Sequence, residues 1–149
     1  MKNCKIIASD GEIDLSLPVD ADESETFYDI FLHNTNINVG NISYNDVYRN
    51  VFYQGNVGYF IVKQYRGNNY ALKALNLLKE ELKRLGRSDI LLNIYEDNYP
   101  SINTAKRFGA KLVCYRKIPE KFKFYFDGIH EKIAVYDYKL EKESKRSIK

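Results

Sequence analysis

The chain has 149 residues, of which 44% are hydrophobic and 29% charged, so it fits one compact domain and is not wholly disordered. Its formal net charge of +3 is too small to identify a nucleic-acid-binding protein by itself. The apolar runs fall far short of the roughly 18 residues that a membrane-spanning helix needs, and no secretory signal pattern is visible after Met1. We therefore expect a soluble, cytoplasmic protein with one domain over residues 1–140 and a charged, solvated tail over residues 141–149.

The first third of the chain is predicted to be β structure. Short apolar or alternating segments are separated by turn signals, and the first two segments are expected to form a hairpin. Between them and the later strands, Asp20–Glu25 carries four carboxylates and is expected to be a solvated loop. The strands expected in this part are Cys4–Ala8, Ile13–Leu17, Phe27–Leu32 and Ile37–Tyr44.

The middle of the chain is predicted to be a β-α-β unit. Its first strand, Val57–Val62, is nearly all apolar, which is typical of a central strand covered on both faces. Hydrophobic residues then repeat at helical spacing over residues 71–85, and Gly86 provides a C-terminal stop. Because the strand Asp89–Tyr95 follows, a right-handed crossover would make the two strands a parallel pair.

The last third is predicted to contain a shorter helix and two closing strands. Pro100 opens the helix, which continues to about Phe108, and Gly109 closes it. The strands Leu112–Tyr115 and Ile133–Leu140 follow. No internal repeat or low-complexity segment is visible, so these elements are assigned to the same domain.

The cysteines and histidines predict no metal site. Cys4 and Cys114 have no metal-ligand spacing, and a reducing compartment argues against a disulfide between them. His33 and His130 lie far apart in the sequence, without a nearby group of ligands, so both are expected to be structural or solvated. No metal cofactor is therefore expected.

The segment between the first strand and the long helix is the most informative for function. Residues 64–71 read Gln-Tyr-Arg-Gly-Asn-Asn-Tyr-Ala. A Gly/Asn turn that opens a helix directs backbone N–H groups one way and adds the positive end of the helix dipole, so it can bind phosphate. An ordinary strand-to-helix loop is the alternative. The segment is neither GxxxxGK[ST] nor GxGxxG, which disfavours nucleoside triphosphates and dinucleotides.

Two segments resemble motifs of the GNAT acetyltransferases. Residues 58–71, GYFIVKQYRGNNYA, resemble motif A of that family, Q/R-x-x-G-x-G/A. Residues 98–110, NYPSINTAKRFGA, are similar to the N-x-x-S-x-x-x-A-x-K-x-G-F segment of the ribosomal-protein alanine acetyltransferase branch. Residues 39–42, VGNI, are a weaker match to an I-G-x-I strand. The resemblance implies an α/β fold with a mixed, mostly antiparallel sheet, a splayed parallel strand pair and flanking helices.

The resemblance also implies an activity and a cosubstrate. The chain would be an acetyl-CoA-dependent N-acetyltransferase that passes the acetyl group directly to a primary amine of a small molecule or of a protein N-terminus. Its expected partners are acetyl-CoA and that amine, with no nucleic acid and no membrane. The implied CoA-binding residues are Phe60, Ile61, Val62, Gln64, Tyr65, Arg66, Gly67, Asn68, Asn69, Tyr70, Ala71, Asn98 and Ser101.

The resemblance defines the catalytic residues less closely. Ala105 stands where many GNAT enzymes have the tyrosine that protonates the leaving thiolate. Ser101, which matches a position near the sulfur, is therefore the expected proton donor or hydrogen-bond partner of the thiolate, with helix capping as the alternative for Asn98 and Ser101. No carboxylate lies within Val57–Val62. Glu96 and Asp97 follow the next strand and could help remove a proton from an ammonium acceptor, directly or through water. Glu96 is the expected catalytic residue of the two, with solvated loop carboxylates as the alternative.

Other features depart from the family pattern or stay open. Asn69 replaces the usual Gly or Ala; Asn tolerates the left-handed region at a cost of roughly 1 kcal/mol, and its side chain would either obstruct the phosphate or donate to it. A hairpin and the segment Asp20–Glu25 stand where the family has a helix pair, so the acceptor side is either open or completed by another subunit, as in a homodimer. Tyr136 and Tyr138 either line the acceptor cleft or pack.

Two alternative functions follow from the same features. A GNAT-fold protein that binds CoA without catalysis is suggested by Asn69, Ala105 and the missing helix pair. An RNA- or ribosome-binding module is suggested by the basic charge and the 13 tyrosines. The tyrosines are spread over the strands rather than grouped with Lys and Arg, so this second alternative ranks lower.

Overall fold

The computed structural model describes residues 5–17, 25–45 and 57–140, which contain all the strands and helices expected from the sequence, together with two short 3-10 helices. Three parts of the sequence-based predictions lie outside these ranges: Cys4, residues 18–24 with most of the acidic segment, and the tail over residues 141–149. The elements are β1 (Ile6–Ser9), β2 (Ile13–Ser16), β3 (Glu25–Leu32), β4 (Asn38–Asn45), β5 (Val57–Ile61), η1 (Lys63–Tyr65), α1 (Tyr70–Arg84), β6 (Asp89–Tyr95), α2 (Tyr99–Phe108), β7 (Lys111–Lys117), η2 (Glu120–Tyr125) and β8 (Lys132–Lys139).

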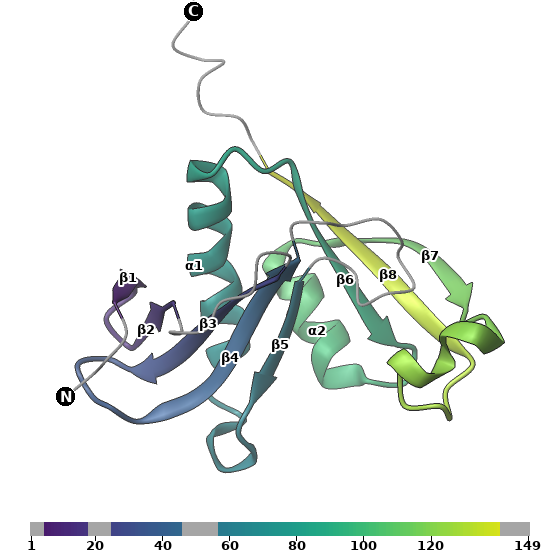
Figure 1. The fold of residues 1–149 in the computed structure, drawn as a ribbon, viewed down its shortest axis with the longest axis horizontal. Coiled ribbons are helices and arrows are strands. Elements are labelled where there is room, and N and C mark those ends of the chain that lie inside the picture. The colour runs from purple at the N-terminus through teal and green to yellow at the C-terminus, as the bar shows by residue number, and fades with distance from the viewer. Residues whose placement is uncertain (1–4, 18–24, 46–56, 141–149) are drawn as a thin grey trace, which may run out of the picture.

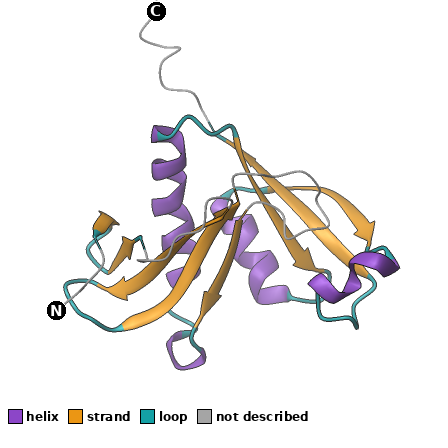
Figure 2. Ribbon diagram, viewed as in Figure 1, coloured by secondary structure: helices purple, strands orange, loops and turns teal. Residues whose placement is uncertain are grey.

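The strands form two antiparallel sheets that diverge from each other (Figure 1). One sheet has the order β1-β2-β3-β4-β5 and the other has the order β6-β8-β7. The two strands of the expected β-α-β unit, β5 and β6, are edges of different sheets. Among the described strands they form no ladder with each other, so the expected parallel pair is splayed apart. The helix α2 lies between the two sheets (Figure 2).

The helix α1 packs on one face of the larger sheet. Its buried side chains are Ala74, Leu75, Leu78 and Leu82, which repeat at helical spacing and join a core formed by residues such as Ile30 and Ile42. The helix ends as expected, because Gly86 adopts a positive φ of 80° that residues with a Cβ rarely adopt. A second, smaller cluster on the other sheet consists of Leu91, Ile118, Ile133 and Val135.

The strand β5 corrects one sequence-based prediction. Its apolar run favoured a strand covered on both faces, but β5 is the edge of its sheet, Gly58 is exposed and Phe60 is 52% exposed. An apolar strand can also border a cleft, and periodicity alone does not separate the two cases. On its other side β5 lies very close to β4, since a Cβ on Gly40 would be 2.1 Å from the carbonyl oxygen of Phe60.

The alternation of apolar and polar residues in β2 does not correspond to one buried and one exposed face. Asp14 and Ser16 are buried, with 2% and 0% exposure. The carboxylate of Asp14 accepts a bond from the backbone N–H of Asn34 at 3.1 Å, and it lies 2.8 Å from Nδ1 of His33. His33 thus has the structural role expected for it. Within the described ranges, no helix is both long and apolar enough to span a bilayer.

Candidate active site

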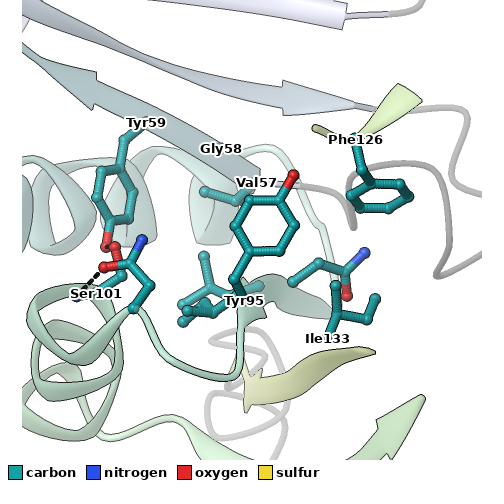
Figure 3. A pocket seen from close by; sticks show the side chains of 11 residues that line it. Val57, Gly58, Tyr59, Tyr95, Ser101, Phe126 and Ile133 are labelled. Atoms are coloured by element: carbon teal, nitrogen blue, oxygen red, sulfur yellow. Dashed lines mark hydrogen bonds between the residues drawn. The ribbon is translucent and has the colours of Figure 1, made fainter. Parts of the chain in front are cut away.

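Two adjoining pockets lie between β5, the end of β6 and the start of α2. The larger pocket, of about 510 Å³, is bordered by β5, the turn before α1, and α2. The smaller pocket, of about 270 Å³, is bordered by β5, β6, Phe126 and Ile133 (Figure 3). Tyr59, Asn98 and Ser101 line both pockets, so they mark the junction between them.

The turn before α1 presents backbone donors to the larger pocket. Gly67 and Asn69 both have positive φ values, of 89° and 63°. The first helical bond of α1 runs from the N–H of Lys73 to the carbonyl of Asn69, so the N–H groups of Tyr70 and Ala71 precede the first intrahelical bond. Such N–H groups, with the positive end of the helix dipole, are suited to an anionic ligand.

The side chain of Asn69 is held by α2. Asn69 adopts the left-handed conformation expected for this position, with φ 63° and ψ 22°. Its Oδ1 accepts a hydrogen bond of 2.7 Å from Nη1 of Arg107. Arg107 lines the larger pocket and was not identified from the sequence, because it lies 38 residues from Asn69. The larger pocket therefore carries a guanidinium next to the backbone donors of the turn.

The free edge of β5 forms a wall of the cleft. The N–H of Val62 bonds to the carbonyl of Val39 at 2.8 Å, which sets the bonded positions along the antiparallel ladder with β4. Since bonded positions alternate, the backbone groups of Tyr59 and Ile61 point away from β4. Arg66 confirms this for Ile61, because its Nε donates to the Ile61 carbonyl at 2.8 Å. An extended ligand could pair with the remaining edge groups.

Ser101 lies at the start of α2, at the junction of the pockets. Asn98 caps the helix, since its Oδ1 accepts the N–H of Ser101 at 3.3 Å, and Pro100 occupies the first turn. Tyr59 points from β5 toward Ser101, and its hydroxyl donates to Oγ of Ser101 at 3.2 Å (Figure 3). Burial raises the pKa of the Tyr59 phenol, which therefore keeps its proton. The hydroxyl proton of Ser101 is thus directed away from Tyr59.

Most of the residues implied by the family resemblance lie together, but four do not reach the pockets. Val62, Gln64, Asn68 and Glu96 line neither pocket; Glu96 is exposed in the turn after β6. The side chain of Asn68 bonds to the carbonyl of Tyr65 at 3.0 Å instead. The expected residues that line the larger pocket are Phe60, Ile61, Tyr65, Arg66, Gly67, Asn69, Tyr70, Ala71, Asn98 and Ser101.

The smaller pocket has aromatic walls that the sequence did not indicate. The rings of Tyr95 and Phe126 meet edge to face, with centroids 6.3 Å apart. Burial raises the pKa of the Tyr95 phenol, and its oxygen accepts the N–H of Asp127 at 2.8 Å. Tyr136 and Tyr138 line neither pocket: Tyr136 is 3% exposed in the core, and Tyr138 packs on Phe108 with ring centroids 4.6 Å apart.

Comparison with known proteins identifies the fold around this cleft. Residues 9–111 match the family model described as an acetyltransferase (GNAT) domain. Among curated proteins there is no significant match.

Solved structures share the fold at low sequence identity. The ribosomal L7/L12 alpha-N-protein acetyltransferase RimL, in complex with coenzyme A, has a TM-score of 0.64 and 21% identity over 78% of this chain and 63% of its own. The ribosomal-protein-S5-alanine acetyltransferase from Vibrio fischeri has a TM-score of 0.64 and 20% identity over 79% and 63%. The microcin C7 self-immunity acetyltransferase MccE, in complex with acetyl-CoA and AMP, has a TM-score of 0.63 and 20% identity over 78% and 62%. The chain thus spans less than two thirds of the length of these structures.

Proposed function

The chain belongs to the GNAT acetyltransferase family, and we propose that it transfers the acetyl group of acetyl-CoA directly to a primary amine. The observation that carries the proposal is the junction at Ser101, where the backbone-rich larger pocket opens into the aromatic smaller pocket. The larger pocket would hold the CoA part and the smaller pocket the amine. The acetyl group would then lie between them, within reach of both partners.

The larger pocket has the groups that a CoA ligand needs. The free backbone of β5 at Tyr59 can pair with the amide groups of the pantetheine arm, as an added strand would. The N–H groups at the start of α1, with Arg107 beside them, suit a pyrophosphate. Val62, Gln64 and Asn68 would contribute through the path of the backbone, because their side chains do not line the pocket.

The chemistry assigned to this cleft is a single displacement. The amine nitrogen attacks the thioester carbonyl carbon, the C–S bond breaks, and the sulfur leaves with the bonding electron pair. Ser101 is the proposed proton donor to that sulfur and regains a proton from solvent afterwards, while Tyr59 supports it by donating to the Ser101 oxygen. Because Ala105 is fully buried and has no hydroxyl, the position of the usual tyrosine supplies no competing donor.

The amine must lose a proton before or during attack. Glu96 is the proposed acceptor of that proton. Since Glu96 is exposed and lines neither pocket, it would act through water. Orientation of the two substrates in the cleft would supply much of the rate.

The proposal is tested first by calorimetric titration with acetyl-CoA and then by a thiol-release assay. The amine panel contains short peptides beginning with alanine or serine, spermidine, an aminoglycoside and glucosamine. The peptides are included because two of the similar structures are named as acetyltransferases of ribosomal proteins. We expect acetyl-CoA to bind and at least one amine to be acetylated; absence of binding at millimolar acetyl-CoA would refute the proposal.

A CoA-binding protein without catalysis is the alternative that the same experiments separate. The observation that favours this alternative is Ala105, which leaves the cleft without the usual tyrosine. It predicts that acetyl-CoA binds, that no amine in the panel is acetylated, and that Ser101→Ala changes only the affinity for CoA. Turnover that depends on Ser101 would exclude it.

A further inference from the structure

A cluster of four side chains, one of which lines the smaller pocket, has no part in the proposed chemistry. Tyr95 is the last residue of β6 and Asp97 lies two residues beyond it, whereas Asp127 and His130 belong to the connection between β7 and β8. We call these four residues the clasp. Their hydrogen bonds and ring contacts join segments that are more than 30 residues apart in the sequence.

His130 is the centre of the clasp. Its Nε2 lies 2.8 Å from Oδ1 of Asp97, and its Nδ1 bonds to Oδ2 of Asp127. Because a carboxylate only accepts hydrogen bonds, both contacts are satisfied together only when both ring nitrogens carry a proton, which makes the imidazole a cation. The ring also stacks on Tyr95, with centroids 4.2 Å apart and an interplanar angle of 11°. His130 therefore bonds to one carboxylate from the turn after β6 and to one from the β7–β8 connection.

Asp127 fixes the other half of the clasp. Its Oδ1 accepts the backbone N–H groups of Ile129 at 2.8 Å and of His130 at 2.9 Å. These donors lower the pKa of Asp127 to about 2, so it is a carboxylate at neutral pH. Its own N–H donates to the Tyr95 hydroxyl at 2.8 Å. Asp127 thus ties its own turn to the end of β6.

The clasp determines where the aromatic wall of the smaller pocket lies. Phe126 immediately precedes Asp127, and its ring packs edge to face on Tyr95. Other bonds lie within this connection or at the end of β7: Lys123 pairs with Glu131 at 2.9 Å, and the N–H of Ile118 bonds to the carbonyl of Glu131 at 2.8 Å. Phe126 also packs on the smaller hydrophobic cluster, which includes Leu91 of β6, so the clasp adds polar contacts to this apolar packing.

Resting on the proposed function, we propose that His130 is a positioning residue for the amine: as a cation between Asp97 and Asp127, it holds Tyr95 and Phe126 against the smaller pocket. The groups that face the imidazole are the two carboxylates and the phenol of Tyr95. When the imidazole loses its proton, one of its two bonds is lost and the wall loosens. The affinity for the amine should then fall, while the affinity for acetyl-CoA is unchanged.

The direction of the pH effect follows from these contacts. The bonds to Asp127 and, second, to Asp97 raise the pKa of His130 above its ordinary value of 6.5. The clasp is therefore complete below pH 6.5 and opens as the pH rises through the raised pKa. The KM for the amine should rise over that range.

The test compares His130→Gln and Asp97→Asn with the control His33→Gln, using the amine of the panel that reacts fastest. His33 is a matched control because it also contacts an aspartate, Asp14 of β2, whereas His130 stacks on Tyr95, which lines the smaller pocket. We expect the two clasp variants to raise the KM for the amine about tenfold, as for one lost charge-assisted hydrogen bond, and to leave the KM for acetyl-CoA unchanged. In His130→Gln the pH dependence of the amine KM should disappear.

Equal changes in both KM values, or wild-type behaviour of His130→Gln, would overturn the proposal. Because the chain has two histidines, His33→Gln leaves one imidazole signal in the NMR spectrum, which reports the titration of His130 directly. We expect a raised pKa that falls in the double variant with Asp97→Asn; titration at the ordinary value would refute the cationic clasp. These NMR experiments need no substrate, so failure of acetyl-CoA binding would refute the proposed function without deciding the clasp.

If no amine of the panel reacts, amide hydrogen exchange decides. Residues 126–131 should exchange at least about tenfold faster in His130→Gln than in His33→Gln, because the connection loses its bond to Asp97. Equal exchange rates in the two variants would refute the clasp.

Discussion

Most residues that line the larger pocket come from one continuous segment, whereas the residues that line the smaller pocket come from several distant segments. Residues 59–71 supply the strand edge, the turn and the helix start that face the larger pocket. Tyr95, Phe126 and Ile133 come to the smaller pocket from β6, the β7–β8 connection and β8. The larger pocket therefore depends mostly on the local path of one segment, whereas the smaller pocket depends on how distant segments pack together.

The largest expected effect tests the backbone of the larger pocket. A Cβ at Gly40 would lie 2.1 Å from the Phe60 carbonyl oxygen, so β4 and β5 must move apart in Gly40→Ala. We expect a loss of about 3 kcal/mol in the free energy of unfolding, measured by urea denaturation. Gly58→Ala is the control, because its nearest contact would be Ser43 Oγ at 3.7 Å. Equal stability of the two variants would contradict the close approach of these strands.

The second prediction concerns the junction of the pockets. Ser101→Ala should lower kcat about 100-fold at unchanged KM for acetyl-CoA, because the leaving thiolate loses its proton donor. Tyr59→Phe should lower kcat about tenfold, since Ser101 then keeps its proton but loses the supporting bond. Ser9→Ala, an exposed serine on β1, is the control in the same steady-state assay. A purely packing role for Ser101 would instead change stability and leave kcat intact.

The third prediction separates the shape of the turn from its side chain. Asn69→Ala puts a residue that tolerates the left-handed region less well than Asn at this position and removes the partner of Arg107, so it should cost about 1 kcal/mol of stability and weaken CoA binding about fivefold. Asn69→Gly keeps the turn and should weaken CoA binding only about twofold. Calorimetry measures both affinities. Equal CoA affinities of the two variants would show that the left-handed conformation of residue 69 does not contribute to CoA binding.

The smallest expected effect concerns the stability contributed by the clasp. His130 has a raised pKa, so its contribution is full below 6.5 and is lost as the pH rises through the raised value. Asp127 has a pKa lowered from 3.8 to about 2, so its contribution is full above 3.8 and is lost as the pH falls toward 2. The difference in unfolding free energy between the wild type and His130→Gln should therefore be largest between pH 3.8 and pH 6.5. A pH-independent difference would contradict the ion pairs.

Local patterns predicted the elements well but misjudged their surroundings. The period of the apolar residues placed α1, and the limits of β6 agree with the predicted Asp89–Tyr95. The same reasoning treated β5 as covered on both faces, because an apolar strand that borders a cleft has the same composition as a buried one. The burial of the polar residues of β2 was also unexpected. Asp14 contacts His33, which lies 19 residues away, so no local pattern indicates its partner.

By itself, the sequence determined the order of the strands and helices, the turn at Gly67 and Asn69, and the motifs that resemble the GNAT family. These features depend on residues that are neighbours in the chain, so local sterics and spacing are enough to predict them. The tertiary structure alone brought Arg107 to Asn69, Tyr59 to Ser101, and His130 to Asp97. Each of these pairs joins segments more than 30 residues apart, and the packing of two divergent sheets, rather than any local pattern, places them within hydrogen-bonding distance.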